Sequence, residues 1–166
     1  MTSPKQPEGD DARAAYYRRM MSTVKDAPAG AAEPTLRYCI ASTPRSGSTL
    51  LSRTLEATGL AGVPMEYLNP SFIRGWQSCA PGRHAELSGY LANLESRRTT
   101  PNGAFGIKVH WAQLHRIATE ARRPLAEITS IVLGRHTKFI RINRRDKLGQ
   151  AISCLLYTSD AADDLL

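Results

Sequence analysis

The chain has 166 residues, 42% of them hydrophobic, and 22 Lys and Arg against 15 Asp and Glu give it a formal net charge of +7. This length predicts a single modest α/β core and argues against a second domain. No apolar run approaches the roughly 18 residues that a membrane helix needs, and the polar N-terminus has no signal core, so we expect a soluble cytoplasmic protein with no membrane span. The three cysteines lack C-x-x-C spacing and predict neither a disulfide framework nor a zinc site.

Residues 1–35 are rich in Pro, Ala and charge. They predict a disordered or weakly helical tail, with a short helix over 11–25 followed by a linker, and we assign no function to them. From Leu36 onward, strand and helix patterns alternate. The predicted elements are a strand from 36 to 41, a helix from 48 to 58, helices 70–79 and 86–97, a strand 104–109, helices 111–121 and 125–131, a strand 138–142 and a helix from 146. This alternation predicts a parallel sheet flanked by helices, with ligands at the carboxyl ends of the strands.

The segment STPRSGSTLL, residues 42–51, joins the first predicted strand to the first helix. A loop of small residues lets successive backbone N–H groups converge on one anion, and the helix that follows adds its positive dipole end. Arg45 offers a guanidinium that suits phosphate or sulfate, and Ser46, Ser48 and Thr49 offer hydroxyls. The pattern therefore predicts an anion-binding loop, with an ordinary loop and helix cap as the alternative.

The same loop differs from the nucleotide-binding pattern GxxxxGK[ST] in its cation. In that pattern a lysine reaches the terminal phosphates and the next hydroxyl binds magnesium. Here no lysine precedes Ser48 or Thr49, and Arg45 is the loop's only cation. Hydrolysis of ATP or GTP is therefore disfavoured, although a P-loop-type kinase or hydrolase stays as the second hypothesis.

A second basic block, FIRINRRDKLGQAIS, covers residues 139–153. If a strand ends at Ile142 and a helix begins at Asp146, Arg145 lies in the turn and Ser153 about two helical turns later, so both can reach one ligand. A basic turn followed by an unrelated helix serine is the alternative.

Taken together, the two blocks resemble the bacterial trehalose 2-sulfotransferase family over 36–153. The resemblance implies a P-loop-like sulfotransferase architecture, the donor 3′-phosphoadenosine 5′-phosphosulfate (PAPS) and no metal. It implies that Arg145 and Ser153 bind the 3′-phosphate. The residues that it assigns to the 5′-phosphosulfate are Pro44, Arg45, Ser46, Gly47, Ser48 and Thr49. One departure is Gly149, where the family usually has a second arginine and where glycine weakens a helix.

The acceptor side is predicted around Glu66, in a loop-like stretch between two prolines. A carboxylate within hydrogen-bond reach can take the proton of a sugar hydroxyl, and Glu66 stands at a position similar to the family's proposed general base. We therefore predict Glu66 and Arg45 as catalytic, and Tyr67 and Asn69 as substrate-binding. A surface glutamate and a core tyrosine are the alternatives.

Lys108 and His110 close the predicted strand 104–109 and would reach the same sheet edge. His110 is the rival base, because many other sulfotransferases use histidine, but a histidine beside Trp111 is more often a packed residue. The resemblance implies trehalose or a related glycoside as acceptor and a homodimer.

The excess of cations lies between the N-terminal tail and the acidic C-terminal end, and suits a polyanionic partner. Nucleic acid is disfavoured, because no RNP-like run or aromatic-interleaved basic stripe is present. A basic binding module without catalysis is the third hypothesis.

The predicted domain ends at Ser153. Residues 154–166 resemble a translated sequencing adapter, which implies a C-terminal end that is not native and a sulfotransferase fold that is incomplete there. We expect apolar surface to be exposed as a result, and the chain as given to be inactive. A genuine acidic C-terminal helix is the alternative.

Overall fold

The computed structural model describes residue 15 and residues 19–20, 25–27, 33–79, 86–136 and 138–159. The elements in chain order are β1 (Leu36–Ser42), α2 (Ser48–Ala57), α3 (Pro70–Cys79), α4 (Leu87–Arg98), β2 (Ala104–His110), α5 (Trp111–Ala121), α6 (Leu125–Leu133), β3 (Lys138–Arg141) and α7 (Lys147–Ser159). The order of strands and helices predicted from residue 36 onward is confirmed. Most of the predicted helix 11–25, and residues 160–166, lie outside the described residues.

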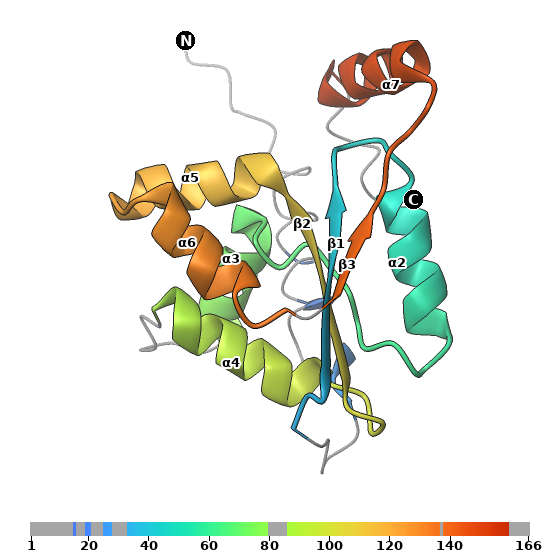
Figure 1. The fold of residues 1–166 in the computed structure, drawn as a ribbon. Helices are drawn as coiled ribbons and strands as arrows, with labels where there is room; N and C mark the ends of the chain where they lie inside the picture. The colour runs from blue at the N-terminus through green and yellow to red at the C-terminus, as the bar shows by residue number, and fades with distance from the viewer. Residues whose placement is uncertain are drawn as a thin grey trace, which may run out of the picture.

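The strands form one parallel sheet in the order β2–β1–β3. Leu36 of β1 is paired with Ala104 of β2, and the register runs in step to the ends of both strands. On the other side, β1 pairs with β3. Figure 1 shows α2 on one side of the sheet and α4, α5 and α6 on the other. The predicted α/β class is confirmed, and the parallel register brings the carboxyl ends of all three strands to one edge.

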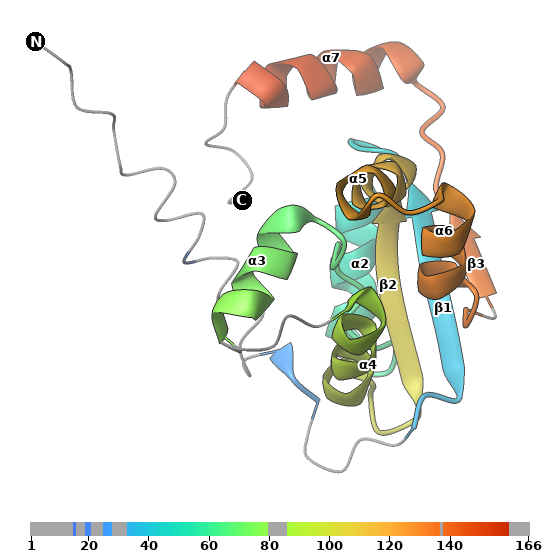
Figure 2. The same cartoon turned by 90° about the vertical axis from the view of Figure 1, so that its left-hand side faces the viewer.

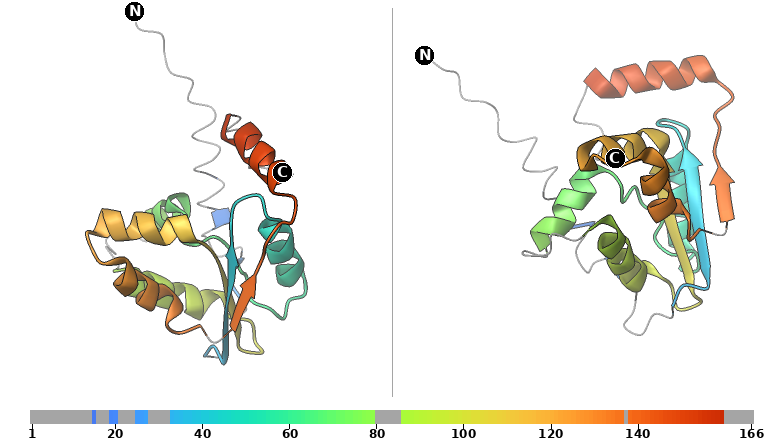
Figure 3. Two further views of the ribbon diagram at one scale, coloured as in Figure 1. Left: turned by 45° about the horizontal axis from the view of Figure 1, so that its top comes forward. Right: turned by 60° about the vertical axis from the view of Figure 1, so that its left-hand side comes forward.

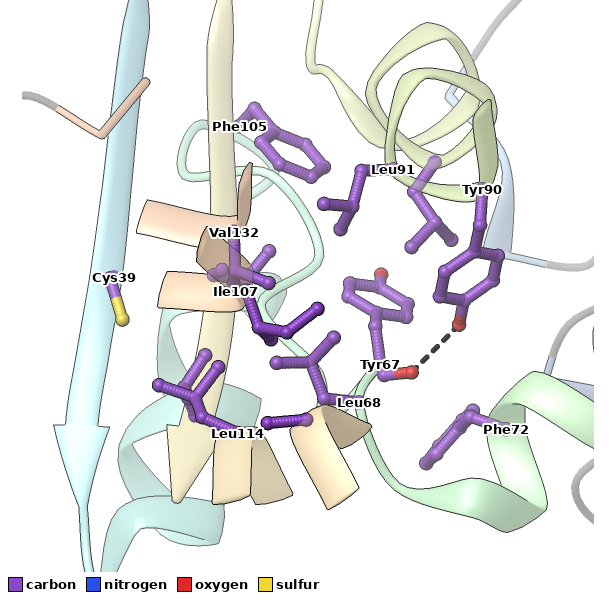
Figure 4. Packing of buried hydrophobic residues seen from close by; sticks show 14 residues of the cluster. Cys39, Tyr67, Leu68, Phe72, Tyr90, Leu91, Phe105, Ile107, Leu114 and Val132 are labelled. Atoms are coloured by element: carbon purple, nitrogen blue, oxygen red, sulfur yellow. Dashed lines mark hydrogen bonds between the residues drawn. The ribbon is translucent and has the colours of Figure 1, made fainter. Parts of the chain in front are cut away.

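The hydrophobic core lies between β2 and the helices that cover it. Every residue of β2 is buried, because helices cover its faces and a loop covers its outer edge. Figure 4 shows Phe105 of this strand beside Leu91 of α4, and Ile107 beside Val132 of α6. Burying these aliphatic and aromatic side chains contributes the main favourable term in folding.

The segment before β1 contacts the body of the domain. Asp26 pairs with Arg97 (Nε to Oδ2, 2.9 Å) and with Arg98 (3.3 Å), and Arg98 also donates a hydrogen bond to the Met20 carbonyl. The Ala27 N–H donates to the Arg97 carbonyl at 2.7 Å. The sequence predicted a linker here, whereas these described residues are packed against the C-terminal end of α4.

In contrast, β3 and α7 are largely exposed. All four residues of β3 are exposed, with Phe139 at 57%, and α7 carries exposed apolar side chains at Leu148, Ile152 and Leu155. Figures 2 and 3 show α7 beyond the carboxyl ends of the strands. Apolar exposure of this kind was expected from the sequence at the C-terminal part of the chain.

Candidate active site

The loop between β1 and α2 has the backbone geometry of an anion-binding nest. Arg45 (φ 58°) and Gly47 (φ 90°) are left-handed, and Ser46 between them is not. This alternation turns successive N–H groups toward one side, and α2, beginning at Ser48, adds the N–H groups of its first turn. The left-handed conformation is natural for glycine but costs about 1 kcal/mol or more at Arg45. Such local strain is typical of a loop that is held ready for a ligand.

Hydrogen bonds join this loop to α7. Arg45 Nε donates to Ser153 Oγ at 2.8 Å. The Gln150 side-chain amide donates to Thr43 Oγ1 at 2.9 Å and to the Pro44 carbonyl at 2.7 Å. The structure therefore brings the two basic blocks of the sequence together, as the two-block prediction requires. Sequence reasoning missed Gln150, although it stands one helical turn before Ser153.

The loop that carries Glu66 extends the sheet beyond the outer edge of β2. Met65 forms a parallel bridge with Ile107, and the Lys108 N–H donates to the Met65 carbonyl at 2.9 Å. Gly62, at φ 71°, begins this approach, and a Cβ there would lie 2.9 Å from the Ala104 carbonyl oxygen. Backbone pairing therefore places Glu66 beside the carboxyl end of β2.

Tyr67 anchors the same loop from the core. Its side chain is only 1% exposed, and its hydroxyl donates to the Val63 carbonyl at 2.5 Å. Its own carbonyl accepts a hydrogen bond from the Tyr90 hydroxyl at 2.8 Å, drawn as a dashed line in Figure 4. Because its ring packs edge-on against Phe72, it is not available to stack on a sugar. The position of Tyr67 therefore disagrees with its predicted role in substrate binding.

Glu66 is held at three points. Its Oε1 lies 2.7 Å from His110 Nε2 and 3.0 Å from Lys108 Nζ, and its Oε2 accepts a hydrogen bond from the Gln113 amide at 3.3 Å. Lys108 Nζ also donates to Thr49 Oγ1 at 3.0 Å. Lys108 thus connects the anion-binding loop to the carboxylate, and the expectation that Lys108 and His110 reach the same sheet edge agrees with the structure.

These contacts determine the protonation of His110 and Glu66. His110 Nδ1 lies 2.9 Å from the Ser42 carbonyl, which can only accept, so Nδ1 carries a proton. Burial would lower the pKa of His110, but its hydrogen bond to Glu66 and the charge of that carboxylate raise it above the ordinary value. Burial likewise opposes ionisation of Glu66, yet its hydrogen bond with His110 and the charge of Lys108 lower its pKa to about 2. Glu66 is therefore ionised at neutral pH.

A cleft of about 480 Å³ lies between the anion-binding loop and the Glu66 loop. This volume falls within the range of about 300–1,000 Å³ that is usual for ligand pockets. Its lining residues are Pro44, Arg45, Ser48, Thr49, Glu66, Asn69, His110, Ala112, Gln113 and Arg116. The cleft therefore brings the Arg45 guanidinium and the Ser48 and Thr49 hydroxyls into one lining with the Glu66 carboxylate.

The remaining predicted site residues lie outside this lining. Ser46 Oγ is buried without a hydrogen-bond partner among the described residues, and Gly47 shapes the loop. Arg145 is exposed in the turn before α7, and Ser153 is reached through Arg45. Sequence reasoning missed Gln113 and Arg116. Their spacing of three residues on a helix that follows a strand end was the available signal.

Within the described parts of the chain, no group of three or more His, Cys, Asp or Glu side chains could hold a metal ion. No helix in those parts is long and apolar enough to cross a membrane.

The sequence matches the family model described as Stf0 sulphotransferase over residues 37–158, which extends beyond the predicted domain boundary at Ser153. A trehalose 2-sulfotransferase of Mycobacterium tuberculosis is 29% identical over 145 residues, covering 70% of this chain and 54% of the relative. A trehalose 2-sulfotransferase of Mycolicibacterium smegmatis is 27% identical over the same length, with the same coverage. The chain thus spans about half the length of these curated relatives. Because the family match covers most of the chain and nearly every residue that forms the cleft and its supports, the chain belongs to the Stf0 sulphotransferase family.

Proposed function

We propose that the whole protein transfers a sulfuryl group from PAPS to a hydroxyl of a carbohydrate, with trehalose or a related glycoside as acceptor. The observation that carries this proposal is the single cleft that joins the Arg45 loop to Glu66. Family membership and the two mycobacterial trehalose 2-sulfotransferases support it. The cytoplasmic location and the homodimer implied by the resemblance stay predictions.

The Arg45 loop has the chemistry of a sulfate and phosphate site. PAPS supplies a sulfuryl group joined to a phosphate leaving group. The loop N–H groups, the Arg45 guanidinium and the Thr49 hydroxyl would stabilise the negative charge that builds up on the transferred group and on the 5′-phosphate. Ser153, which accepts a hydrogen bond from Arg45, and Arg145, exposed in the turn before α7, are proposed to hold the 3′-phosphate.

Activation of the acceptor hydroxyl depends on how strongly Glu66 binds a proton. A pKa of about 2 makes its carboxylate a weak base, because a general base works best when its pKa is near the working pH. Lys108 Nζ lies 3.0 Å from both Glu66 and Thr49, so an anion bound beside Thr49 would compete with Glu66 for this ammonium. Weaker pairing would raise the pKa of Glu66, so that donor binding would make Glu66 a better base. Asn69 lines the same cleft and is proposed to bind the acceptor.

Calorimetric titration with adenosine 3′,5′-bisphosphate, without magnesium, tests the donor site. We expect binding that depends on the 3′-phosphate, with AMP as the control nucleotide. Arg45→Ala should weaken it by 10-fold or more, because a charge-assisted hydrogen bond is worth roughly 1.5–3 kcal/mol. Arg53→Ala, an exposed position on α2, is the matched control and should bind like the wild type.

Transfer to trehalose by the whole protein, assayed with PAPS, tests the acceptor site. Glu66→Gln keeps the shape of the side chain but cannot take a proton, so it should bind the bisphosphate and lose turnover. Equal affinity for AMP and the bisphosphate would contradict a PAPS site, and a requirement for magnesium would favour the kinase or hydrolase hypothesis. Full turnover by Glu66→Gln would contradict the base assignment.

A further inference from the structure

Gln113 lies in the first turn of α5 with both ends of its amide engaged. It is 8% exposed, its Oε1 accepts the His110 backbone N–H at 3.0 Å, and its Nε2 donates to Glu66 Oε2 at 3.3 Å. A backbone N–H can only donate, so it fixes which end of the amide is the oxygen. The NH₂ group must then face Glu66. Gln113 therefore joins the start of α5 to the carboxylate in one defined orientation.

The two oxygens of Glu66 consequently differ. Oε1 lies 2.7 Å from His110 Nε2 and 3.0 Å from the Lys108 ammonium nitrogen, so two side chains contact it. Oε2 receives one longer hydrogen bond from the neutral Gln113 amide. A carboxylate oxygen has room for about two donors, so Oε2 keeps accepting capacity and Oε1 does not. Glu66, Gln113 and His110 all line the cleft, so the carboxylate and its amide and imidazole partners border the space that an acceptor would occupy.

We propose that Gln113 is a positioning residue that holds Glu66 so that Oε2 takes the proton of the acceptor hydroxyl, an inference that rests on the proposed function. In this step the acceptor O–H proton moves to Oε2 and the acceptor oxygen bonds to sulfur. The sulfur–oxygen bond to the 5′-phosphate breaks, and its electron pair stays on the departing phosphate. Sulfate ester and adenosine 3′,5′-bisphosphate are the products.

A purely structural role for Gln113 is the competing explanation. Its bond to the His110 N–H completes one half of a helix capping box, and this bond alone would account for a buried glutamine. The two roles use different ends of the amide. Gln113→Glu keeps an oxygen for the His110 N–H, since glutamate is equally suited to a capping box, and replaces the donor that faces Glu66 by an acceptor. Gln113→Leu removes both bonds.

Titration of the side-chain carboxyl of Glu66 by ¹³C NMR, assigned with Glu66→Gln, gives a readout that does not require turnover. In Gln113→Glu we expect the apparent pKa of Glu66 to rise above about 2, because a donor is lost and a second carboxylate is brought near. Gln113→Leu should raise it by a smaller amount. Glu120→Gln, exposed on the same helix, should leave it unchanged. An unchanged Glu66 titration in Gln113→Glu would overturn the proposal, whether or not Gln113→Leu folds.

Kinetics of the whole protein with PAPS and trehalose distinguishes a failure of this inference from a failure of the proposed function. Gln113→Glu should lower kcat about 100-fold, as expected for a misplaced catalytic group, while affinity for adenosine 3′,5′-bisphosphate stays at the wild-type level. A wild-type protein that binds neither nucleotide nor acceptor would count against the proposed function. Wild-type turnover retained by Gln113→Glu would count against the positioning role alone.

Discussion

Both ring nitrogens of His136 are buried where α6 leads into β3. Burial lowers its pKa from the ordinary value of 6.5, so the ring stays neutral in the fold, whereas in the unfolded chain it takes up a proton below that value. The contribution of His136 to the stability of the fold is therefore present above pH 6.5 and is lost as the pH falls below that value. The pKa of His110 is raised, so the pH dependence of its contribution to stability has the opposite sign: His110 stabilises the fold more at acid pH.

We therefore expect His136→Phe to lose less stability than the wild type between pH 7 and about pH 5, the range in which histidine titrates. The phenyl ring keeps the contact with Phe105 and cannot be protonated. Urea unfolding at both pH values measures the difference. If stability falls by the same amount in both proteins, burial of a neutral His136 is not the cause of the acid sensitivity.

Adjacent residues show what the sequence could and could not predict about the site. Glu66 lines the cleft, as its predicted role requires, whereas Tyr67 points into the core. Proline-flanked loops carry no periodic pattern, so the sequence gives no signal for which of two neighbours faces inward. Gln113 was missed for a related reason, since its importance depends on Glu66, which approaches it only in the folded protein.

At the scale of elements, the Glu66 loop depends on close backbone approach at Gly62. A Cβ there would meet the Ala104 carbonyl oxygen at 2.9 Å, and φ is 71°. Gly59 has a similar φ of 66°, but its Cβ would meet nothing within 4 Å. Both glycines have a left-handed backbone, which is unfavourable for any other residue. Only at Gly62 would an added Cβ also clash with the edge of β2. The pair therefore separates conformational strain from the close approach.

We expect Gly59→Ala to cost about 1 kcal/mol and Gly62→Ala roughly 2–4 kcal/mol, because the latter adds a steric clash to the same strain. Gly62→Ala should also push the loop off β2 and weaken the contacts of Glu66 with His110 and Lys108. Thermal unfolding measures the first effect, and the ¹³C titration of Glu66 the second. Equal destabilisation by the two substitutions would show that the approach to β2 is looser than 2.9 Å implies.

For the whole molecule, alternating strand and helix patterns were enough to predict the parallel sheet and the order of its elements. Contacts between distant segments were not predictable in the same way. The Met65–Ile107 bridge and the Asp26–Arg97 pair join residues that carry no shared local pattern. The composition of residues 1–35 predicted a linker, because a Pro- and Ala-rich segment with many charges buries little apolar surface by itself. Its described residues are held by contacts with the body of the domain: Asp26 pairs with α4, Lys25 pairs with Glu56 of α2, and Met20 packs against the hydrophobic core.

Asp26 is the centre of that pairing. It contacts Arg97 and Arg98, and the Arg98 side chain is completely buried. Asp26→Asn keeps the shape of the side chain but removes the charge that compensates a buried guanidinium, and breaking buried pairs costs about 3–5 kcal/mol. Since Asp26 is 19% exposed, we expect a loss nearer 2–3 kcal/mol by urea unfolding. Glu33→Gln removes one exposed carboxylate from the same segment and should change stability by less than about 0.5 kcal/mol. Equal, small effects of both substitutions would show that the segment before β1 is the linker its composition predicts.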